Sequence, residues 1–416
     1  MENNLYKKSS YLLILLVTSL GNFVDYADMF MATLVRDDAI RALGIAQTKE
    51  AILKAGLNLE AFQATGFFLG CFTWGIFADK KGRLHVLYVS TFVYSIANIV
   101  NGLLSPSWEH VYYWYGGCRL FSGWGLSAEF SIAITIVVEF FSVRKRIIGT
   151  MLMTGLGFTG VFLVSWLKFY TDIAWHQYFI WGGVAGLLLL AFRFTVQESF
   201  MFLNQPTSII KKGSLVTLLT KKKYLKKILL SVSIILPLFL VQLIIKFSAN
   251  ISQQINSNLI SIALVLLIYD VCSICSDILG CYISYVLNNR IVVLKVYLVL
   301  LFISLLIFAI WPPLTSFSWY WIYVPLLAFT AGYWACWGTM ISELIGINLR
   351  ATTTTFIINL SRSFVLILTV LFKNLDTTYG FSITIIIIAL LTCGLAFWAI
   401  FKIPETAYRD LEFVEK

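Results

Sequence analysis

Charged residues are scarce in this chain. Asp, Glu, Lys and Arg make up 12% of its 416 residues, whereas hydrophobic residues make up 59% and the mean hydropathy is +0.84. Soluble domains carry about 25% charged residues, so this composition leaves too little polar surface to cover a soluble fold. The scarcity of charge therefore excludes an ordinary soluble globular protein.

Histidine is almost absent, and so are the motifs that carry enzymatic chemistry. His85, His110 and His176 each stand alone, so we expect no metal cluster and no Ser-His-Asp set. The sequence has no Gly-x-x-x-x-Gly-Lys loop, which leaves nucleotide-driven pumping without support. We predict that the chain is not an enzyme and that it uses no metal and no cofactor.

The seven cysteines give no sign of a disulfide framework, because all of them fall inside apolar segments. Cys272 and Cys275 have the spacing of a redox or metal pair. No histidine lies near them, and both are expected at the depth of the lipid. We interpret them as ordinary helix residues.

Long apolar runs are what the sequence has in abundance. Crossing the hydrocarbon core of a bilayer takes about 20 apolar residues per helix. The runs predict an all-α membrane protein with twelve transmembrane helices, at 11–35, 58–79, 84–104, 110–140, 147–170, 175–196, 227–249, 257–286, 291–312, 317–343, 352–374 and 378–402. The first run is too long for a signal peptide, so we expect it to be retained as a span.

The formal net charge of +10 comes from basic residues in short loops, which is no sign of nucleic-acid binding. Most Lys and Arg residues fall on the side of the predicted topology that holds both termini. Cytoplasmic loops of membrane proteins carry such an excess. We therefore predict a multi-pass protein of the plasma (inner) membrane with both termini in the cytoplasm. The other side holds only Arg36, Arg41, Lys49, Lys54, Lys168, Lys246 and Lys373.

Two halves of the chain repeat each other. Glu139 and Arg146 recur as Glu343 and Arg350, 204 positions later. Gly75 recurs as Gly280 after 205 positions, and Glu198 recurs as Glu405 after 207. We predict an N-terminal six-helix bundle at 1–196, a basic cytoplasmic linker at 197–226, which could also bind anionic lipid, and a C-terminal six-helix bundle at 227–416. Paired repeats of this kind are typical of alternating-access carriers.

Two acids interrupt the first apolar run. Asp25 and Asp28 are three residues apart, so both side chains point to one face of a helix. At the centre of a membrane helix the two together cost about 6 kcal/mol. That face must therefore meet a cavity, a cation or a proton.

Arg119 in the fourth span is the expected counter-ion of that face, and Glu129 falls near the same stripe of its helix. One arginine opposite three acids leaves surplus carboxylates, which suits groups that load and release a proton. We predict that Asp25, Asp28, Arg119 and Glu129 couple transport to protons. The alternative is a static ion pair that only fixes helix packing.

The second half has its own polar positions at membrane depth. We predict that they contact a solute: Gln242, Lys246, Asp270, Asp277, Trp334, Trp337, Asn359 and Arg362. For the tryptophans, ordinary aromatic packing is an equal alternative. Arg362 needs an anion, and we expect this to be Asp270, Asp277 or a carboxylate on the solute.

The loop after the second span reads Gly75-Ile-Phe-Ala-Asp79-Lys-Lys-Gly82-Arg83. It resembles the signature loop of the major facilitator superfamily, and this resemblance implies that Asp79 and the basic residues latch the cytoplasmic ends together. We therefore predict a gating role for Gly75, Asp79, Gly82, Arg83, Glu139, Arg146, Glu343 and Arg350. In the second half Ser284 stands where the Asp would be, so a symmetric latch is not expected.

Parts of the sequence resemble two branches of that superfamily. The first span, with Gly21, Asn22, Asp25 and Asp28, is similar to that of the metabolite:proton symporters. Arg119 is placed as in the sugar porters, where a first-helix acid and a fourth-helix arginine take part in proton coupling. This resemblance implies that role for Asp28 and Arg119. The glutamine-rich motif of the sugar porters has no clear match.

Taken together, the sequence predicts proton-coupled import of a small polar metabolite, an organic acid or amino acid, by alternating access. We expect the partners to be this solute, protons and the bilayer, with no nucleic acid, and the chain to be a monomer. One alternative is a facilitative uniporter of a sugar-like solute whose buried charges are structural. The other is a transporter-like sensor, although a linker of about 30 residues leaves no room for a signalling domain.

Overall fold

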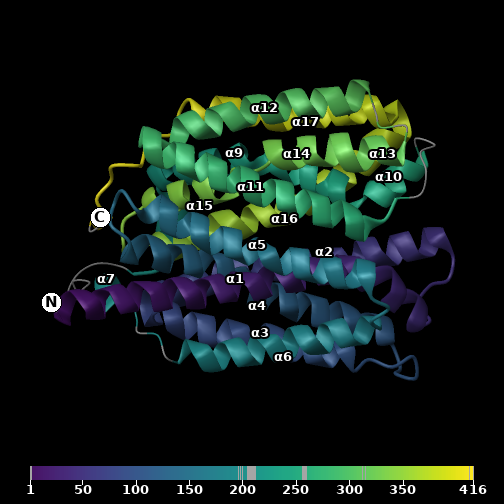
Figure 1. Ribbon diagram of the computed structural model, residues 1–416, viewed down its shortest axis with the longest axis horizontal. Helices are drawn as coiled ribbons and strands as arrows, with labels where there is room; N and C mark the ends of the chain where they lie inside the picture. The colour runs from purple at the N-terminus through teal and green to yellow at the C-terminus, as the bar shows by residue number, and fades with distance from the viewer. Residues whose placement is uncertain are drawn as a thin grey trace.

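Twelve helical spans make up most of the described residues of this computed structural model. The structure describes residues 2–194, 196, 198, 200–203, 212–254, 260–311, 313, 315–411 and 413–415, and these contain no strand. Both termini lie at the left-hand end of the molecule in Figure 1. We call this the terminal end and the opposite one the distal end.

Six helices form the N-terminal bundle: α1 (Glu2–Ala42), α2 (Lys49–Lys81), α3 (Arg83–Gly102), α4 (Val111–Phe140), α5 (Arg146–Tyr170) and α6 (Trp175–Arg193). Short helices α7 (Phe200–Leu203) and α8 (Leu215–Thr220) precede the second bundle, and α10 (Ser248–Gln254) lies inside it. The spans of the second bundle are α9 (Lys222–Lys246), α11 (Ile262–Leu287), α12 (Arg290–Ile310), the broken span Ser316–Glu343, α16 (Arg350–Tyr379) and α17 (Phe381–Ile400).

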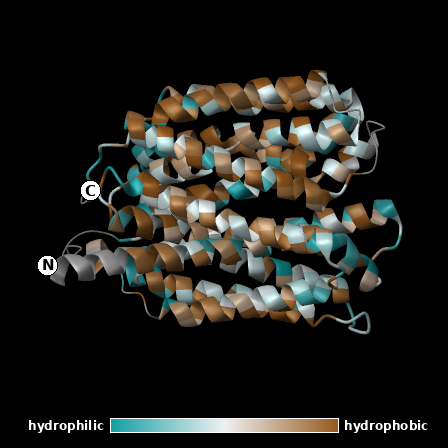
Figure 2. Ribbon diagram, in the orientation of Figure 1, coloured by the Kyte–Doolittle hydropathy of each residue, from teal (hydrophilic) through white to brown (hydrophobic). Residues whose placement is uncertain are grey.

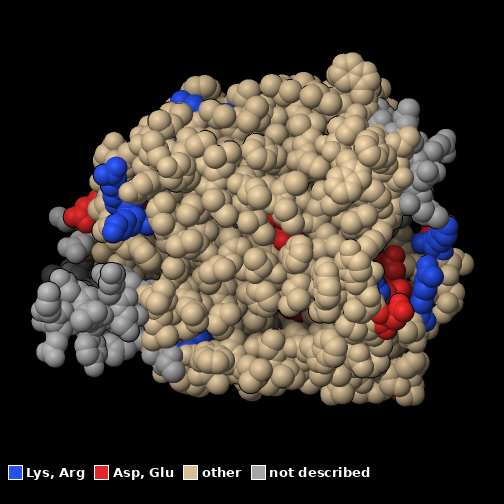
Figure 3. Space-filling model, viewed as in Figure 1, with Lys and Arg blue, Asp and Glu red and all other residues tan. Residues whose placement is uncertain are grey.

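The two bundles lie side by side with their helices roughly along one axis (Figure 1). They meet where α2 packs along α16 and α5 packs along α11. Hydrophobic residues, coloured brown, run along the lengths of the helices in Figure 2. In Figure 3 the charged side chains gather at the two ends, and the flank between them is almost all uncharged. This pattern is that of a protein surrounded by lipid, and the predicted fold class is confirmed.

The tenth span is not one continuous helix. It consists of α13 (Ser316–Ser318), a π-helical turn (Trp319–Tyr323), α14 (Val324–Thr330) and α15 (Trp334–Glu343). Gly332 lies in the break, where a Cβ atom would come within 2.4 Å of Ser276. The backbone N–H of Ala335, freed at the start of α15, donates to the Asp277 carboxylate at 3.0 Å. A side chain of α11 thus satisfies the new helix N-terminus.

Predicted helix boundaries differ from the observed ones mainly outside the apolar runs. The first helix continues to Ala42 and the second begins at Lys49, so both extend beyond the predicted spans. The seventh span begins at Lys222, within the segment predicted to be linker. Hydropathy alone misses these ends because they are polar turns of the same helices. Much of the predicted linker, including Lys211, lies outside the described residues.

Candidate functional site

A small cavity of about 40 Å³ lies between the two bundles. Helices α1 and α5 line it from the first bundle, and α9, α11, α16 and the break before α15 line it from the second. Its walls combine aromatic rings with the charged side chains of Asp270, Asp277 and Arg362. We call it the inner cavity. By volume it holds about three water molecules.

A wider vestibule of about 270 Å³ adjoins the inner cavity. The two share Met29, Phe239, Gln242 and Arg362. The vestibule is also lined by Lys246 and Lys373, which come near the distal ends of α9 and α16. It therefore leads from the distal end of the molecule towards its middle.

The terminal end of the interface is held shut by Asp79. Its carboxylate accepts hydrogen bonds from the backbone N–H groups of Ala351 (3.2 Å) and Thr352 (2.8 Å) and from the Thr352 hydroxyl (2.6 Å). Asp79 lies in the last turn of α2, whereas Thr352 lies in the first turn of α16. A carboxylate of one bundle therefore caps a helix of the other, where the helix dipole favours negative charge.

Glu139 joins three elements at the same end. One carboxylate oxygen lies 3.0 Å from Arg83 and 3.1 Å from Arg350, and all three side chains are buried. Arg83 belongs to α3 of the first bundle, whereas Arg350 begins α16 of the second. This charge cluster crosses the interface, so the bundles cannot part here without separating it.

Two glycines permit this close approach. A Cβ atom on Gly75 would come within 2.6 Å of the Thr352 Cα atom, so a larger residue would hold α2 and α16 apart. Gly82 has a φ of 115°, a conformation that glycine adopts without strain. The predicted gating positions Gly75, Asp79, Gly82, Arg83, Glu139 and Arg350 thus lie together at the closed terminal end.

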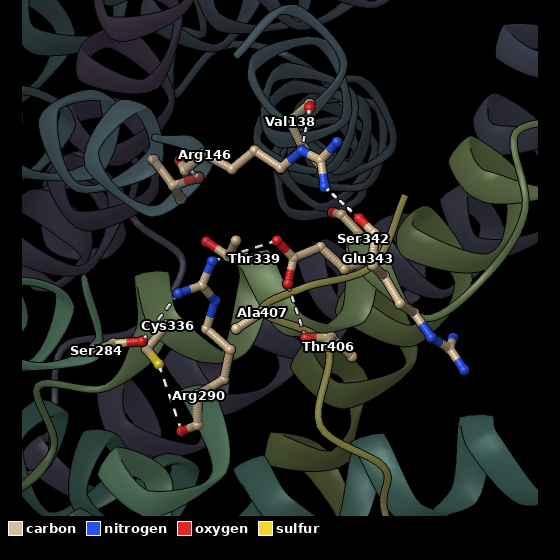
Figure 4. A network of polar contacts seen from close by, with 12 residues as sticks. Val138, Arg146, Ser284, Arg290, Cys336, Thr339, Ser342, Glu343, Thr406 and Ala407 are labelled. Carbon is tan, nitrogen blue, oxygen red and sulfur yellow. Dashed lines mark hydrogen bonds and ion pairs between the residues drawn. The ribbon is translucent and has the colours of Figure 1, made fainter. Parts of the chain in front are cut away.

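In the second bundle the corresponding network is incomplete (Figure 4). Arg290 lies 3.4 Å from Glu343 and donates to the Ser284 hydroxyl at 3.1 Å. Glu343 also accepts from the Thr406 hydroxyl at 2.7 Å. Arg146, the counterpart of Arg350, donates instead to the carbonyls of Val138 (3.2 Å) and Arg409 (2.8 Å). The contacts of the predicted latch residues therefore differ between the two bundles.

The repeated pair Glu198 and Glu405 caps equivalent helices. Glu198 accepts from the backbone N–H of Leu84 at 3.0 Å, at the start of α3. Glu405 accepts from the N–H groups of Arg290 and Ile291 at 3.0 Å, at the start of α12. Like these acids, the first residues of the two helices, Arg83 and Arg290, are 207 positions apart. The repeat seen in the sequence is thus a repeat of contacts.

Within the first bundle Asp28 lies in a polar cluster. It accepts from the Asn98 amide at 2.7 Å and from the Ser122 hydroxyl at 3.0 Å. Arg119 donates to the Asn98 carbonyl at 3.5 Å, so Asn98 links the acid and the arginine. The predicted neighbourhood of Asp28 and Arg119 is therefore present, with an amide between the two charges.

Glu129 does not lie against Arg119, as the sequence had predicted, but pairs with Arg193. Its carboxylate is gripped by Arg193 at 2.8 and 2.5 Å and also accepts from the Thr91 hydroxyl at 2.8 Å. Arg193 is the last residue of α6 and is buried. The helical wheel of α4 could not reveal this partner, because it comes from another helix. The expected surplus of carboxylates around Arg119 is wrong.

Asp25 lies near Arg362 and not, as predicted, against Arg119. Its carboxylate oxygen lies 3.7 Å from the Arg362 guanidinium of the second bundle. The guanidinium lies over the rings of Phe67, Phe130 and Trp334, at 5.2 to 5.9 Å from their centroids. The expectation that Asp270 or Asp277 pairs with Arg362 is therefore wrong within this structure.

With these contacts in place, the chain can be compared with known proteins. Its sequence matches the family described as Major Facilitator Superfamily over residues 18–370, most of its length. The chain belongs to the major facilitator superfamily.

Two curated proteins are similar to part of this chain. YyaJ of Bacillus subtilis (strain 168), named as a candidate metabolite transport protein, is 30% identical over 191 residues, which are 44% of this chain and 39% of YyaJ. YaaU of Escherichia coli (strain K12), named in the same way, is 23% identical over 203 residues, 48% of this chain and 42% of YaaU. The matches span about two fifths of the length of these curated relatives.

Solved structures of the superfamily share the whole fold. The proton:xylose symporter XylE bound to 6-bromo-6-deoxy-D-glucose has a TM-score of 0.77 at 15% identity and covers 98% of both chains. The human organic anion transporter MFSD10 has a TM-score of 0.74 at 15% identity, covering 94% of this chain and 99% of its own. At such identities the similarity is one of fold.

The residues predicted to contact the solute fall into two groups: those that line a cavity and those that do not. Gln242, Lys246, Asp270, Asp277, Trp334 and Arg362 line the inner cavity or the vestibule. Trp337 does not, since its indole N–H donates to the Ser231 carbonyl at 2.9 Å. Asn359 donates to the Ser127 carbonyl at 2.7 Å and so joins α16 to α4. These two residues pack helices rather than face the cavities.

Sequence reasoning missed Arg193, Asn98, Thr91 and Ser122 as parts of the buried networks. Arg193 carried a usable signal, because an arginine within a span requires an anion. The neutral partners carried none, since Asn, Thr and Ser are common in membrane helices. Only the packing of α3 against α4 and α6, and of α1 against α4 and α6, brings them to the charges.

Proposed function

We propose that this chain is a secondary active carrier that imports a small polar metabolite, an organic acid or an amino acid, together with protons. The observation that carries the proposal is one-sided access. A vestibule leads from the distal end to a charged inner cavity, while Asp79 and Glu139 hold the terminal end closed. Such an arrangement suits one state of an alternating-access cycle.

We place the terminal end in the cytoplasm of a cell whose plasma (inner) membrane holds the protein, because Lys and Arg concentrate there. The vestibule then faces outwards, and the state is ready to accept solute from outside. This supports import, and a monomer is sufficient for the cycle because one chain supplies both bundles.

Asp28 is the proposed proton carrier, with Arg119 as its counter-charge. Asp28 is buried with only neutral side chains bonded to it directly. A carboxyl in that setting can exist with or without its proton, depending on how closely Arg119 approaches. Glu129, held on both oxygens by Arg193, is better suited to stabilising the bundle.

The test is uptake into proteoliposomes against panels of organic acids, amino acids and sugars, with the pH gradient present or collapsed by a protonophore. We expect gradient-driven accumulation of an acid or amino acid. Asp28→Asn keeps the size of the side chain and should abolish accumulation, while solute exchange across the membrane continues. Asp172→Asn, an exposed distal-end acid, serves as the matched control.

Uptake that ignores the protonophore in the wild type would instead indicate a uniporter, and the proton coupling would be wrong. Solute binding without flux would indicate a sensor and would overturn the carrier assignment altogether.

A further inference from the structure

The ion pair between Asp25 and Arg362 is unusually poorly satisfied. Its 3.7 Å separation is the longest among the ion pairs of the described residues, whereas charge-assisted N–H···O bonds measure about 2.7–2.9 Å. Neither carboxylate oxygen of Asp25 and neither terminal nitrogen of Arg362 has a hydrogen-bond partner there. Both side chains are at least 95% buried, at 0% and 5% exposure.

Such a pair is costly to keep. Burying two charges is offset only when good geometry and further hydrogen bonds accompany the attraction. The Glu129–Arg193 pair meets that condition, with contacts of 2.5 and 2.8 Å and a threonine hydroxyl added. The Asp25–Arg362 pair does not. Its free donors indicate that Arg362 is prepared for a better acceptor.

Arg362 also stands where a solute arrives. It lines both the vestibule and the inner cavity. Lys246 and Lys373 line the vestibule that leads to Arg362. The acid in the vestibule lining, Glu60, forms an ion pair with Arg36 at 2.8 Å. The approach is therefore net positive, which attracts anions.

Aromatic rings fix the guanidinium while leaving its N–H groups free. Phe67, Phe130 and Trp334 offer their faces to it, so cation–π attraction holds the group in place. A planar guanidinium held in this way can bind both oxygens of a carboxylate.

In the lining of the inner cavity, Asp270 provides a second unsatisfied group. One of its carboxylate oxygens has no hydrogen-bond partner in the described part of the chain. Ser273, one turn away on α11, lines the same wall. The rings of Tyr26 and Phe158 line the same cavity. The inner cavity thus offers an anion site, apolar rings and an acceptor for a hydroxyl or amine, and a solute larger than about three waters would extend from it into the vestibule, which shares Arg362.

We propose that Arg362 binds the carboxylate of the transported solute, which displaces Asp25, and that Asp25 then takes a coupling proton, in addition to the proton role proposed for Asp28. The solute class is a monocarboxylate with an apolar or aromatic body and a hydroxyl or amine at its far end. This deepens the proposed function and rests on it. The solute enters as an anion, one proton from the vestibule water binds the Asp25 carboxylate, and the step adds no net charge.

The surroundings of Asp25 support this exchange. Its charged and titratable neighbours are Arg362 from α16, Glu129 from α4, Asp28 and Tyr26 from α1 itself and Tyr94 from α3. Arg193 of α6 is committed to Glu129. Once a solute holds Arg362, Asp25 is left near two acids in a buried site, where the neutral form is favoured. Because Asp25 and Arg362 belong to different bundles, the exchange also frees the bundles to move.

The experiment uses purified full-length chain and two matched pairs of probes: 4-hydroxybenzoate with 4-hydroxybenzamide, and L-lactate with L-lactamide. Binding is measured by the ligand-induced shift in unfolding temperature, and flux is measured in proteoliposomes. The wild type should bind a carboxylate at least tenfold more tightly than its amide. Arg362→Gln should abolish this preference, and Arg362→Lys should restore part of it. Arg41→Gln, which removes an exposed distal-end charge, should retain it.

Asp25→Asn is the decisive second variant. It should bind the carboxylate as tightly as the wild type or more tightly, because the internal competitor is gone, and its binding should no longer depend on pH between 5 and 8. Its exchange flux should persist while gradient-driven accumulation is lost.

Equal binding of carboxylate and amide, or an unchanged preference in Arg362→Gln, would overturn this inference. Proton-driven uptake of another solute could then still stand. If carboxylates bind through Arg362 but the wild type never accumulates them under a pH gradient, the carboxylate site stands and the proton-coupled function falls, together with the proton role of Asp25.

Discussion

Arg193 and Glu129 illustrate how a single buried charge is kept inside a membrane bundle. Each carboxylate oxygen of Glu129 faces a guanidinium nitrogen, and Thr91 donates to one of them. Gly21 leaves the space that the guanidinium fills, since a Cβ atom there would lie 2.4 Å from it. The pair is therefore built into the packing of α1, α3, α4 and α6.

Removing one partner of this pair should be far worse than removing both. Glu129→Ala leaves Arg193 buried and unpaired, which we expect to cost about 3–5 kcal/mol of folding stability. The double variant Glu129→Ala, Arg193→Leu should recover most of that loss. Thermal unfolding in detergent measures both, with exposed Glu109→Ala as the control. A double variant no more stable than the single one would contradict the structural role of the pair.

At the scale of elements, the segment after α17 closes over the terminal end. The Phe413 carbonyl accepts from the N–H of Ile347 at 3.0 Å, and the Glu415 N–H donates to Asn348 at 3.0 Å. The Glu415 carboxylate accepts from the Tyr224 hydroxyl at 2.9 Å. This segment thus ties the loop between α15 and α16 to the start of α9.

Glu415 should make this attachment sensitive to pH. Burial alone would raise the pKa of its carboxyl, but the Lys227 ammonium, the Tyr224 hydroxyl and the Lys223 ammonium outweigh it and lower the pKa below the usual 4.5. A lowered folded-state pKa gives stability that is present above pH 4.5 and is lost as the pH falls through the lowered value. The segment should therefore stay docked at neutral pH and detach in acid.

Glu415→Gln imitates the protonated group at neutral pH. A hydrogen bond to a charged group contributes about 1.5 kcal/mol, which corresponds to roughly tenfold in the population of the detached segment. Trypsin should therefore cleave after Arg409 up to tenfold faster in this variant than in the wild type at pH 7.5. Glu109→Gln should cleave at the wild-type rate. Equal rates in all three proteins would mean that the Glu415 side chain does not hold the segment.

The two six-helix bundles share some contacts of the repeated unit and differ in others. Glu198 and Glu405 cap equivalent helices because every copy of the unit must satisfy the same helix start. The interior charges have no such copies. Offsets of 204 to 207 place uncharged residues, Val232 to Ile235 and Tyr333 to Cys336, opposite Asp28 and Glu129. Both bundles thus keep the helix caps of the repeated unit, whereas only the first bundle carries the buried acids Asp28 and Glu129.

For the whole molecule, the closed terminal end depends on Glu139 as the shared acceptor of Arg83 and Arg350. Glu139→Gln keeps the shape and removes the charge, so two buried arginines lose their common anion. The equilibrium should shift towards the state open at the terminal end, by about tenfold for each 1.4 kcal/mol lost. The Gly75 contact with Thr352 is unchanged in this variant.

Spin labels at exposed Lys145 of the first bundle and Lys402 of the second report this shift. With the native cysteines replaced, pulsed electron resonance should show a longer-distance population in Glu139→Gln that is minor in the parent protein. The control is Glu109→Gln. An unchanged distance distribution would show that the charge cluster does not set the balance between states.

The sequence by itself determined the twelve spans, the two bundles and the positions that must be buried as charges. Lipid requires long apolar helices, and an acid or arginine among them stands out by its cost. The resemblance of the Gly75–Arg83 loop to the signature loop of the superfamily also pointed to Asp79, Gly82 and Arg83, which lie at the terminal end of the interface.

Only the tertiary structure decided which charge meets which. Helical periodicity fixes the face of a side chain on its own helix, whereas a partner comes from whichever helix packs against that face. That is why Arg193, from α6, takes Glu129, and why Arg362, from the other bundle, faces Asp25. The break before α15, which gives Asp277 its backbone partner, likewise depends on the contact of Gly332 with α11.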